Sequence, residues 1–420
     1  MPDMDWLSRH LTSLGQIGSL AAGGISRPAL SQLEAEAQDY IRGLMLECGM
    51  SVRLDDATNL FGRLGEPGKP AILTGSHIDT VPQGGKYDGA LGVLAALACA
   101  KEIGSADQYP LALEVVAFAG EESSRFGLSL FGSRAYVGAL DLGKLPSYVD
   151  ASGIGVEDAL ARLGANIESL RRPTMEQRPE AFIELHIEQG TLLRDGGVPA
   201  GVVTAIAAPT RLHVWIEGRA SHSGASLPAD RKDALVGAAH VIAEIESLMK
   251  REAPWQSVAT VGRVRVVPNV INVVPGEVEL GIDIRGSDPG SKHRLVREID
   301  KLVARVSGRR GLAVRRQAVV NEEPVRMDER VVSLVEEAAE EAGVAHTRII
   351  SMAGHDAMQL AQFVPTGMIF VRNQSGISHN PAEEIACADV EAGTQVLHSA
   401  LKKLLTGPLA RETMEKGDQV

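Results

Sequence analysis

Five residues of metal-binding type stand at or beside the ends of predicted strands and helices. They are His77, Asp88, Glu122, His186 and His379. Imidazole nitrogen and carboxylate oxygen are the donors that zinc, manganese, cobalt and nickel accept. A carboxylate can bridge two such ions at about 3.5–4 Å, and Asp88 is our candidate for that bridge. A single histidine at a strand end is most often a structural residue, but five such side chains together favour a centre of two divalent metals.

The first two of these residues lie on one short stretch of chain. The apolar run 71–74 predicts a buried strand, after which His77 and Asp79 share one side of the pleat because side chains alternate. Asp88 directly precedes the apolar run 89–97, which predicts a buried helix with Asp88 at its N-cap. One imidazole and two carboxylates therefore gather at the carboxyl end of a strand, where open α/β sheets place their sites.

Two adjacent carboxylates, Glu121 and Glu122, follow the predicted strand 111–118. Neighbouring carboxylates on a loop repel one another unless cations lie near them, although a solvated acidic turn is the alternative. A pair with this spacing cannot easily ligate the same ion. We therefore expect one of them to bind a metal and the other to move protons as a general base.

Seven motifs occur in order along nearly the whole chain, and together they resemble those of the hydantoinase/carbamoylase amidases. That family includes N-carbamoyl-L-amino acid hydrolases and allantoate amidohydrolases, within the aminoacylase-like metallopeptidase superfamily. The string around His186 is the most specific, because peptidase relatives usually have a carboxylate at this position. The motifs are 75–80 (GSHIDT), 88–89 (DG), 121–126 (EESSRF), 185–190 (LHIEQG), 268–276 (PNVINVVPG), 354–357 (GHDA) and 378–383 (SHNPAE).

The resemblance implies a role for each residue of the metal centre. Two sets of three ligands that share one aspartate would each hold one divalent ion: His77, Asp88 and His186, and Asp88, Glu122 and His379. Glu121 would be the general base and later the acid. Asp79 would orient His77 and fix its tautomer.

The resemblance also implies four residues that contact the substrate. His222 would reach the active site of a partner subunit and polarise the scissile carbonyl. Asn272 and Arg285 would grip the substrate carboxylate, which a guanidinium binds bidentately. Gln189 would contact the carbamoyl end. From the residues alone, each of the four could equally be structural, as an ion pair, a turn former or a loop cap.

The expected activity is metal-dependent hydrolysis of the carbamoyl C–N bond of N-carbamoyl-L-amino acids, which releases the amino acid, carbon dioxide and ammonia. Allantoate or ureidoglycolate is the nearest alternative substrate. A dipeptidase or N-acyl-amino acid deacylase is a second alternative, and His186 counts against it. A catalytically silent binding module is disfavoured because the whole ligand set and Glu121 are intact.

The elements that must position these residues fall into two domains. Strands alternate with helices through 1–209 and again through 325–420, which predicts an α/β catalytic domain with a mixed, mainly parallel sheet flanked by helices. Between them, 210–324 reads as strand–helix–strand–strand–helix–strand, an inserted βαββαβ (ferredoxin-like) domain. Its exposed sheet edge could pair with a copy of itself, so we expect a lid that also forms a homodimer.

The amino-acid composition disfavours some classes of binding partner and indicates the cellular compartment. The chain has 420 residues, and 42 basic against 54 acidic residues give a formal charge of −12, which disfavours nucleic acid and anionic membranes. Aromatic residues make up only 4%, too few for a base-stacking platform. The three cysteines form no CxxC pair, and neither a signal peptide nor a membrane span is expected. A cytoplasmic enzyme with a small-molecule substrate fits these features.

Overall fold

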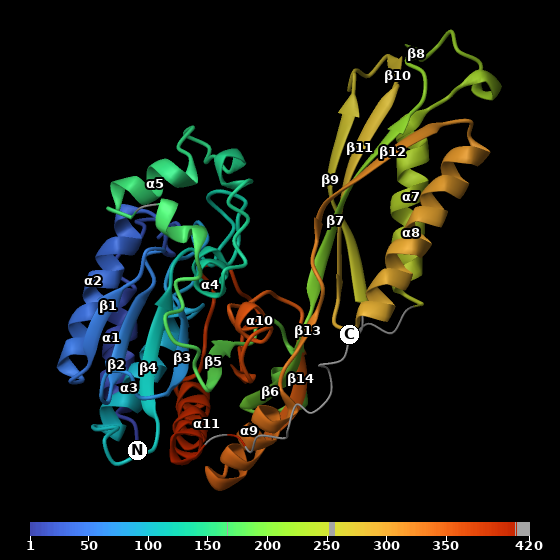
Figure 1. The fold of residues 1–420 in the computed structure, drawn as a ribbon. Coiled ribbons are helices and arrows are strands. Elements are labelled where there is room, and N and C mark those ends of the chain that lie inside the picture. The colour runs from blue at the N-terminus through green and yellow to red at the C-terminus, as the bar shows by residue number, and fades with distance from the viewer. Residues whose placement is uncertain (166, 252–256, 408, 410–420) are drawn as a thin grey trace, which may run out of the picture. The chain divides into compact units, whose positions relative to one another are not determined.

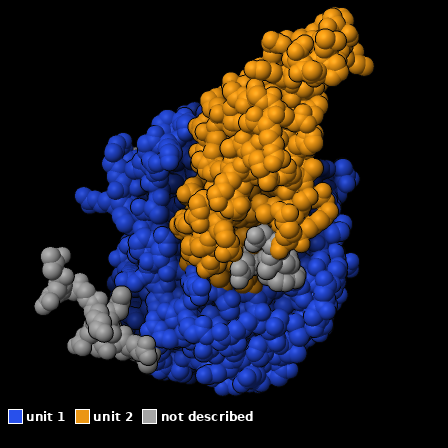
Figure 2. Space-filling model, turned by 90° about the vertical axis from the view of Figure 1, so that its right-hand side faces the viewer, with its two compact units in different colours: residues 1–204, 326–349, 355–420 blue, residues 205–325, 350–354 orange. Residues whose placement is uncertain are grey.

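The computed structural model describes residues 1–420 apart from 166, 252–256, 408 and 410–420. The described residues form two compact units (Figure 2). Unit 1 comprises 1–204, 326–349 and 355–420, and unit 2 comprises 205–325 and 350–354. The sequence predicted that the inserted domain begins at 210, whereas unit 2 begins at 205. Unit 2 also includes residues 350–354, which the prediction assigned to the catalytic domain.

The larger sheet contains nine strands within the described part of the chain (Figure 1). They are β1 (Ser51–Leu54), β2 (Leu60–Leu64), β3 (Ala71–His77), β4 (Ala112–Phe118), β5 (Ala181–Ile187), β6 (Ala200–Ile206), β13 (Val325–Arg326), β14 (His346–Ser351) and β15 (Thr366–Val371). Their order is β1-β2-β4-β3-β5-β15-β6-β13, with β14 paired to β6. The central strands β4, β3, β5 and β15 are parallel, whereas β1–β2, β2–β4 and β15–β6 are antiparallel. This is the mixed sheet with a parallel centre that the sequence predicted.

Helices cover both faces of this sheet. They are α1 (Met4–Leu14), α2 (Gln32–Glu47), α3 (Ala90–Ile103), α4 (Phe131–Val137), α5 (Val156–Arg162), α6 (Leu192–Gly196), α9 (Glu329–Glu341), α10 (Ala357–Leu360) and α11 (Cys387–Thr406). Leu185 of β5 approaches α3 and α11, while the neighbouring Glu184 accepts a hydrogen bond from Ala357 of α10 at 2.9 Å. Because successive side chains of a strand point to opposite faces, α10 lies on the face opposite α3 and α11.

The character of each element follows from its sequence. Almost every residue of α3 is buried, as expected for a helix that is apolar all round. Ser31 caps α2 by accepting a hydrogen bond from Glu34 N, and α9 has the bounds that its apolar spacing predicts. The short elements that the sequence missed include α4, β6, α10 and β14. They have between four and seven residues each, too few for a clear periodic pattern.

Unit 2 is built on a smaller antiparallel sheet. Its elements are β7 (Ala208–Glu217), β8 (Ser221–His222), α7 (Ala234–Met249), β9 (Ser257–Val267), β10 (Val273–Val274), β11 (Glu277–Gly286), α8 (Pro289–Arg309) and β12 (Ala313–Asn321). The four long strands are ordered β12-β7-β11-β9, and all their pairings are antiparallel. One face is apolar: Leu212, Val214 and Ile216 of β7 are buried in a core that includes residues of α7 and α8.

Two further structural facts bear on the expectations from composition. Cys48, Cys99 and Cys387 are free thiols, so none of the three forms a disulfide bond. Among the helices of the described ranges, none is long and apolar enough to cross a membrane.

Candidate metal centre

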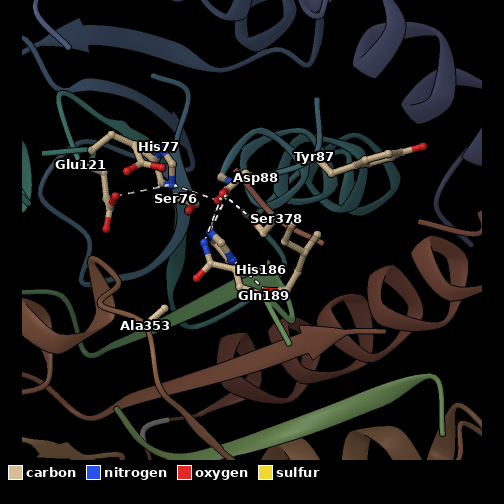
Figure 3. Close-up of polar contacts among 12 residues, drawn as sticks. Ser76, His77, Tyr87, Asp88, Glu121, His186, Gln189, Ala353 and Ser378 are labelled. Atoms are coloured by element: carbon tan, nitrogen blue, oxygen red, sulfur yellow. Dashed lines mark hydrogen bonds and ion pairs between the residues drawn. The ribbon is translucent and has the colours of Figure 1, made fainter. Parts of the chain in front are cut away.

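The five candidate ligands converge within unit 1. Figure 3 shows His77, Asp88 and His186 turned toward one another. His186 Nε2 lies 3.1 Å and His77 Nε2 3.8 Å from Asp88 Oδ1. His379 Nε2 lies 3.1 Å from both Asp88 Oδ2 and Glu122 Oε1. The result is two groups of three potential ligand atoms, each group within 4.8 Å, and Asp88 belongs to both. Their role as ligands remains a prediction.

The parallel centre of the sheet explains why these residues meet. His77 is the last residue of β3, and His186 is the next-to-last residue of β5. Glu122 follows β4, and His379 lies on the connection from β15 to α11. Because these four strands are parallel, their carboxyl ends share one edge of the sheet. Asp88 reaches the same edge from the loop that precedes α3.

The two histidines of the first group are held in the tautomer that a metal ligand needs. His77 Nδ1 lies 3.2 Å from the Asp79 carbonyl oxygen and 3.3 Å from Asp79 Oδ1. His186 Nδ1 lies 3.0 Å from the Ile187 carbonyl oxygen. Since these oxygens only accept, each neutral ring carries its hydrogen on Nδ1. Burial opposes the charged form of both rings, but the neighbouring carboxylates raise the pKa of His77 and His186, so each ring must lose a proton before it can ligate. Each neutral ring then has its Nε2 lone pair on the side of Asp88, where that of His186 also accepts a hydrogen bond from Gly89 N at 3.2 Å.

Asp88 is not the N-cap of α3 as predicted, because Gly89 with its φ of +64° occupies that position. The Asp88 side chain is instead directed at the histidines. Its Oδ1 is buried and makes no hydrogen bond to any described residue. Burial opposes ionisation, but the imidazoles of His186 and His379 hold the pKa of Asp88 well below its usual range. A buried carboxylate oxygen without a donor is costly, and a bound cation would satisfy it.

His379, which completes the second group of ligand atoms, has an uncommon backbone conformation. His379 has a φ of +57°, which is uncommon for a residue with a side chain and clusters at functional sites. Its hydrogen bonds to Asp88 and Glu122 raise the pKa of His379 to about 10. In the protein without metal, this imidazole is therefore protonated at neutral pH. Ligation of a cation requires it to lose that proton.

Glu121 lies beside the cluster but belongs to neither group of ligand atoms. Its carboxylate is 8% exposed, and Oε2 lies 4.0 Å from His77 Nε2 (Figure 3). Burial raises the pKa of Glu121 well above its ordinary value, against the opposing charge of His77 and with support from Glu122. A carboxyl with a raised pKa can both take and return a proton near neutral pH.

Asp79 does more than the predicted orientation of His77. Its two carboxylate oxygens also accept hydrogen bonds from the backbone nitrogens of Glu121 and Glu122, each at 3.0 Å. Asp79 is 0% exposed, so these bonds are shielded from water. One buried carboxylate thus couples the loop after β3 to the loop after β4.

Comparison with known proteins identifies the family. The model of peptidase family M20/M25/M40 matches residues 73–403, a range that contains all five candidate ligands. The chain belongs to this family.

Several relatives of this chain are named as amidohydrolases or amidases. An N-carbamoyl-L-amino-acid amidohydrolase from Pseudomonas sp. (strain NS671) is 37% identical over 400 residues, which cover 94% of this chain and 96% of the relative. A ureidoglycolate hydrolase from Oryza sativa subsp. japonica is 34% identical over 410 residues, covering 96% and 85%. A solved hydantoinase/carbamoylase family amidase from Burkholderia multivorans has a TM-score of 0.88 at 33% identity, covering 97% and 99%. The chain is a metal-dependent amidohydrolase of this type, as the sequence predicted.

In this M20 amidase, Gln189 contacts the ligand cluster directly. Its Nε2 donates to Asp88 Oδ2 at 3.1 Å (Figure 3). The same nitrogen lies 3.2 Å from His379 Nε2. Gln189 therefore lies against the second group of candidate ligand atoms. Its predicted contact with the carbamoyl end stays a prediction.

Two residues of the 378–383 motif also support the M20 site, although the sequence gave them no role. Glu383 Oε1 accepts hydrogen bonds from Tyr87 N at 3.0 Å and Asp88 N at 3.3 Å. Ser378 Oγ lies 3.1 Å from Asp88 Oδ2 and 3.2 Å from Glu383 Oε2, and its single hydrogen can be donated to either oxygen. Both residues hold Asp88, and the motif that contains them was the only sequence signal for them.

The remaining predicted substrate residues belong to unit 2. His222 of β8 pairs with Val273 of β10, and Ser223 N donates to the Asn272 carbonyl at 3.0 Å, so His222 and Asn272 are close together. Arg285 lies near the other end of the unit 2 sheet, on β11. Its guanidinium Nε donates to Asp283 Oδ2 at 2.9 Å, so a substrate carboxylate would compete with this ion pair.

Proposed function

We propose that this chain hydrolyses the carbamoyl C–N bond of N-carbamoyl-L-amino acids. The observation that carries the proposal is the pair of ligand groups that share Asp88, with Glu121 beside them. The relatives named for this activity span nearly the whole chain, which supports the same substrate class.

We further propose that the centre holds two divalent ions, one in each ligand group. Three imidazoles and two carboxylates form a donor set that suits zinc, manganese, cobalt or nickel. The buried Asp88 Oδ1, which lacks a hydrogen bond among the described residues, supports occupation of this site by a cation. When bound, the ions polarise the carbamoyl carbonyl and activate a water molecule near neutral pH.

Glu121 moves the protons in this scheme. Its carboxylate takes a proton from the attacking water and returns it to the nitrogen of the leaving amino acid as the C–N bond breaks. The carbamate that is released then decays to carbon dioxide and ammonia. The raised pKa of Glu121 supports both halves of this transfer, because the protonated form persists long enough to act as the acid.

The tautomer of His222 supports its proposed role on the carbonyl. His222 Nδ1 accepts hydrogen bonds from Gly224 N at 3.1 Å and Ala225 N at 3.2 Å. A neutral imidazole whose Nδ1 accepts must carry its hydrogen on Nε2. The exposed ring is thereby prepared to donate from Nε2 to a carbonyl oxygen.

The separation of Asn272 and Arg285 supports a site that draws on two copies of the chain. Asn272 lies beyond the Glu277 end of β11, and Arg285 lies at the opposite end. This ten-residue strand spans about 30 Å at about 3.3 Å per residue, far more than an amino acid derivative can bridge. If both side chains grip one substrate, they come from different subunits. We therefore propose a homodimer in which unit 2 serves as the ferredoxin-like lid.

A substrate panel tests the proposed function. The enzyme is stripped of metal and reloaded with manganese, zinc, cobalt or nickel, and ammonia release is measured on N-carbamoyl-L-amino acids, allantoate and ureidoglycolate. N-carbamoyl-D-amino acids are the matched control, and dipeptide cleavage is followed by amino acid release. We expect the highest kcat/KM on an N-carbamoyl-L-amino acid and none without metal. Fastest cleavage of dipeptides, or no turnover with any metal, would contradict the proposal.

Allantoate or ureidoglycolate hydrolysis is the second candidate. The rice relative named for ureidoglycolate hydrolysis is nearly as similar to this chain as the carbamoylase relative. These substrates also carry a ureido group and a carboxylate, so the same residues would act on them. The ratio of kcat/KM values in the panel decides between the two candidates.

A further inference from the structure

The segment 25–34, which leads from the region after α1 into α2, borders the loops that carry the candidate ligands. Ile25 N donates to the Gly84 carbonyl at 3.0 Å, and Gly84 N donates to the Ile25 carbonyl at 2.8 Å. Gly84 belongs to the loop that delivers Asp88. One piece of chain that supplies no ligand is therefore in contact with a ligand loop.

Arg27 fastens this segment to the loop after β3. Its side chain is only 1% exposed, and Nε donates to the Ile78 carbonyl at 2.5 Å. Its backbone nitrogen donates to Thr80 Oγ1 at 2.9 Å, and its carbonyl accepts from Thr80 N at 2.9 Å. The guanidinium also donates to two carbonyls at and just beyond the end of α1. Arg27 thus holds the backbone on both sides of Asp79.

Glu34 fastens the same segment to the loop after β4. It is also 1% exposed; Oε1 accepts from Gly120 N at 2.9 Å, and Oε2 accepts from Leu30 N at 2.5 Å. Asp79 accepts the next two N–H groups along the chain, which belong to the adjacent glutamates. Three consecutive backbone donors beside the metal centre are therefore held by two buried carboxylates.

The loop after β4 makes a second contact with the segment. Arg125 Nη1 donates to the carbonyl oxygens of Ala29 at 2.7 Å and Leu30 at 2.6 Å. Leu30 therefore receives a hydrogen bond on its carbonyl from this loop, while its N–H is bound by Glu34. Hydrogen bonds therefore join the segment to the loop at two separate points.

Burying the ionisable side chain of Glu34 costs free energy, so stability alone does not explain why Glu34 holds this loop. Burial, and then the nearby charge of Asp79, raise the pKa of Glu34 to about 8. Burial likewise lowers the pKa of Arg27 to about 10. Buried ionisable groups whose charged form is opposed by their surroundings are weak sources of stability, so the hydrogen bonds of Glu34 to Gly120 N and Leu30 N call for a reason other than stability.

We propose that Glu34 is a positioning residue for the reaction. Through the Gly120 N–H it sets where Glu121 stands relative to the candidate ligands, while Arg27 fixes Asp79 from the other loop. This inference adds a positioning residue to the proposed function. It rests on that function only where turnover is measured, because the exchange measurement needs no substrate.

Glu34→Gln tests the inference because an amide offers a single acceptor oxygen, so Gly120 N–H or Leu30 N–H loses its acceptor. Gln38→Met is the matched control: Gln38 lies one turn further along α2, is 6% exposed and donates to the Thr58 carbonyl at 2.8 Å. Amide hydrogen exchange of the peptide 119–123 is measured on the metal-free protein. Steady-state kinetics use the best wild-type substrate, and melting temperatures establish that both variants fold.

For Glu34→Gln we expect amide exchange at 119–123 to be faster by about tenfold or more. We expect kcat to fall by about 10- to 100-fold, because a misplacement of about 1 Å in a catalytic group has this effect. KM should stay within about threefold of wild type. Gln38→Met should melt at a lower temperature but keep wild-type exchange at 119–123 and wild-type kcat.

Several outcomes would overturn the inference. Unchanged exchange at 119–123 in Glu34→Gln would do so whatever the activity, and so would an equal loss of kcat in both variants. A wild-type enzyme without turnover in the panel defeats the proposed function, while the exchange measurement still tests Glu34. If Glu34→Gln does not fold, Arg125→Gln cuts the same link from the other loop. Faster exchange there supports the inference, and unchanged exchange overturns it.

Discussion

Asp88 and Glu121 show how two carboxylates in one site come to differ. Asp88 faces three imidazoles, which against the effect of burial hold its pKa well below the usual range. Glu121 is buried beside another carboxylate, and its pKa is raised well above the usual range. The first is therefore suited to remain an anion that binds cations, and the second to exchange a proton during turnover.

The different roles proposed for Glu121 and Glu122 predict different effects when each is changed to glutamine. Glu121→Gln should keep the metal content of wild type, because Glu121 is outside both ligand groups. Its kcat should fall by about 10²- to 10⁴-fold, since an amide cannot carry the proton. Metal analysis and ammonia release measure the two effects. Glu122→Gln is the matched control and should lose metal. A Glu121→Gln enzyme with near wild-type kcat would remove Glu121 from the mechanism.

The raised pKa of His379 predicts proton release on metal binding. With a pKa of about 10, His379 is protonated at pH 7.5 and must lose its proton to act as a ligand. Metal affinity should therefore weaken as the pH falls. Calorimetric titration of manganese in buffers of different ionisation enthalpy measures the released protons, and His379→Gln should release fewer. Binding at pH 7.5 without net proton release would contradict this assignment.

At the scale of elements, β5 illustrates how a strand can serve both the core and the site. Its sequence alternates, and the apolar Leu185 faces α3 and α11. The polar side is buried as well: Glu184 accepts from Ser76 Oγ at 2.7 Å and from Ala357 N at 2.9 Å, while His186 reaches Asp88. The polar face of this strand thus fixes its neighbours in the sheet and supplies a ligand.

The start of α3 predicts a sensitive position. Gly89 has a φ of +64°, and an added Cβ would lie 2.5 Å from His77 Nε2. Gly89→Ala should therefore displace His77 and lower metal content and kcat together. Gly153→Ala is the matched control, because Gly153 has a φ of +82° and no described atom within 4 Å of an added Cβ. Both variants carry the backbone strain, which costs about 1 kcal/mol, and Gly89→Ala should melt at the lower temperature because it also displaces the buried His77. Equal metal content in the two variants would refute the steric argument.

At the scale of the whole molecule, unit 2 is where further substrate contacts are proposed. Asn272 lies beyond the Glu277 end of β11 and Arg285 lies near its other end, so a single unit 2 cannot bring both to one small substrate. Two copies of the chain can, provided that each contributes one of the two residues. Activity would then depend on oligomerisation as well as on the metal centre.

This arrangement predicts complementation between two inactive variants. Asn272→Ala and Arg285→Ala should each lose most activity as homodimers. After unfolding and refolding together, half of the dimers are mixed, and each mixed dimer has one intact site if the residues act across subunits. We therefore expect about a quarter of the wild-type activity. Sedimentation analysis establishes the dimer, and each variant refolded alone is the control. No recovery of activity would show that both residues act within one subunit.

The sequence by itself determined the mixed sheet with its parallel centre, and it predicted the candidate ligands. The alternation of residues 181–187 and the apolar spacing of 329–341 predicted a strand and a helix at these places, because burial on one face imposes a period on the chain. The five candidate ligands were recognised because imidazoles and carboxylates at the carboxyl ends of parallel strands share one edge. Short elements such as α10 and β14 were missed because their few residues show no period.

Only the tertiary structure decided what depends on contacts between distant segments. Gly89 caps α3 in place of Asp88, because the aspartate is directed at the histidines. Glu34 reaches Gly120 across 86 positions of sequence, and no local pattern encodes such a contact. The opposite placement of Asn272 and Arg285 likewise follows from strand pairing, which arranges the chain through long-range hydrogen bonds that residue types and spacing do not specify.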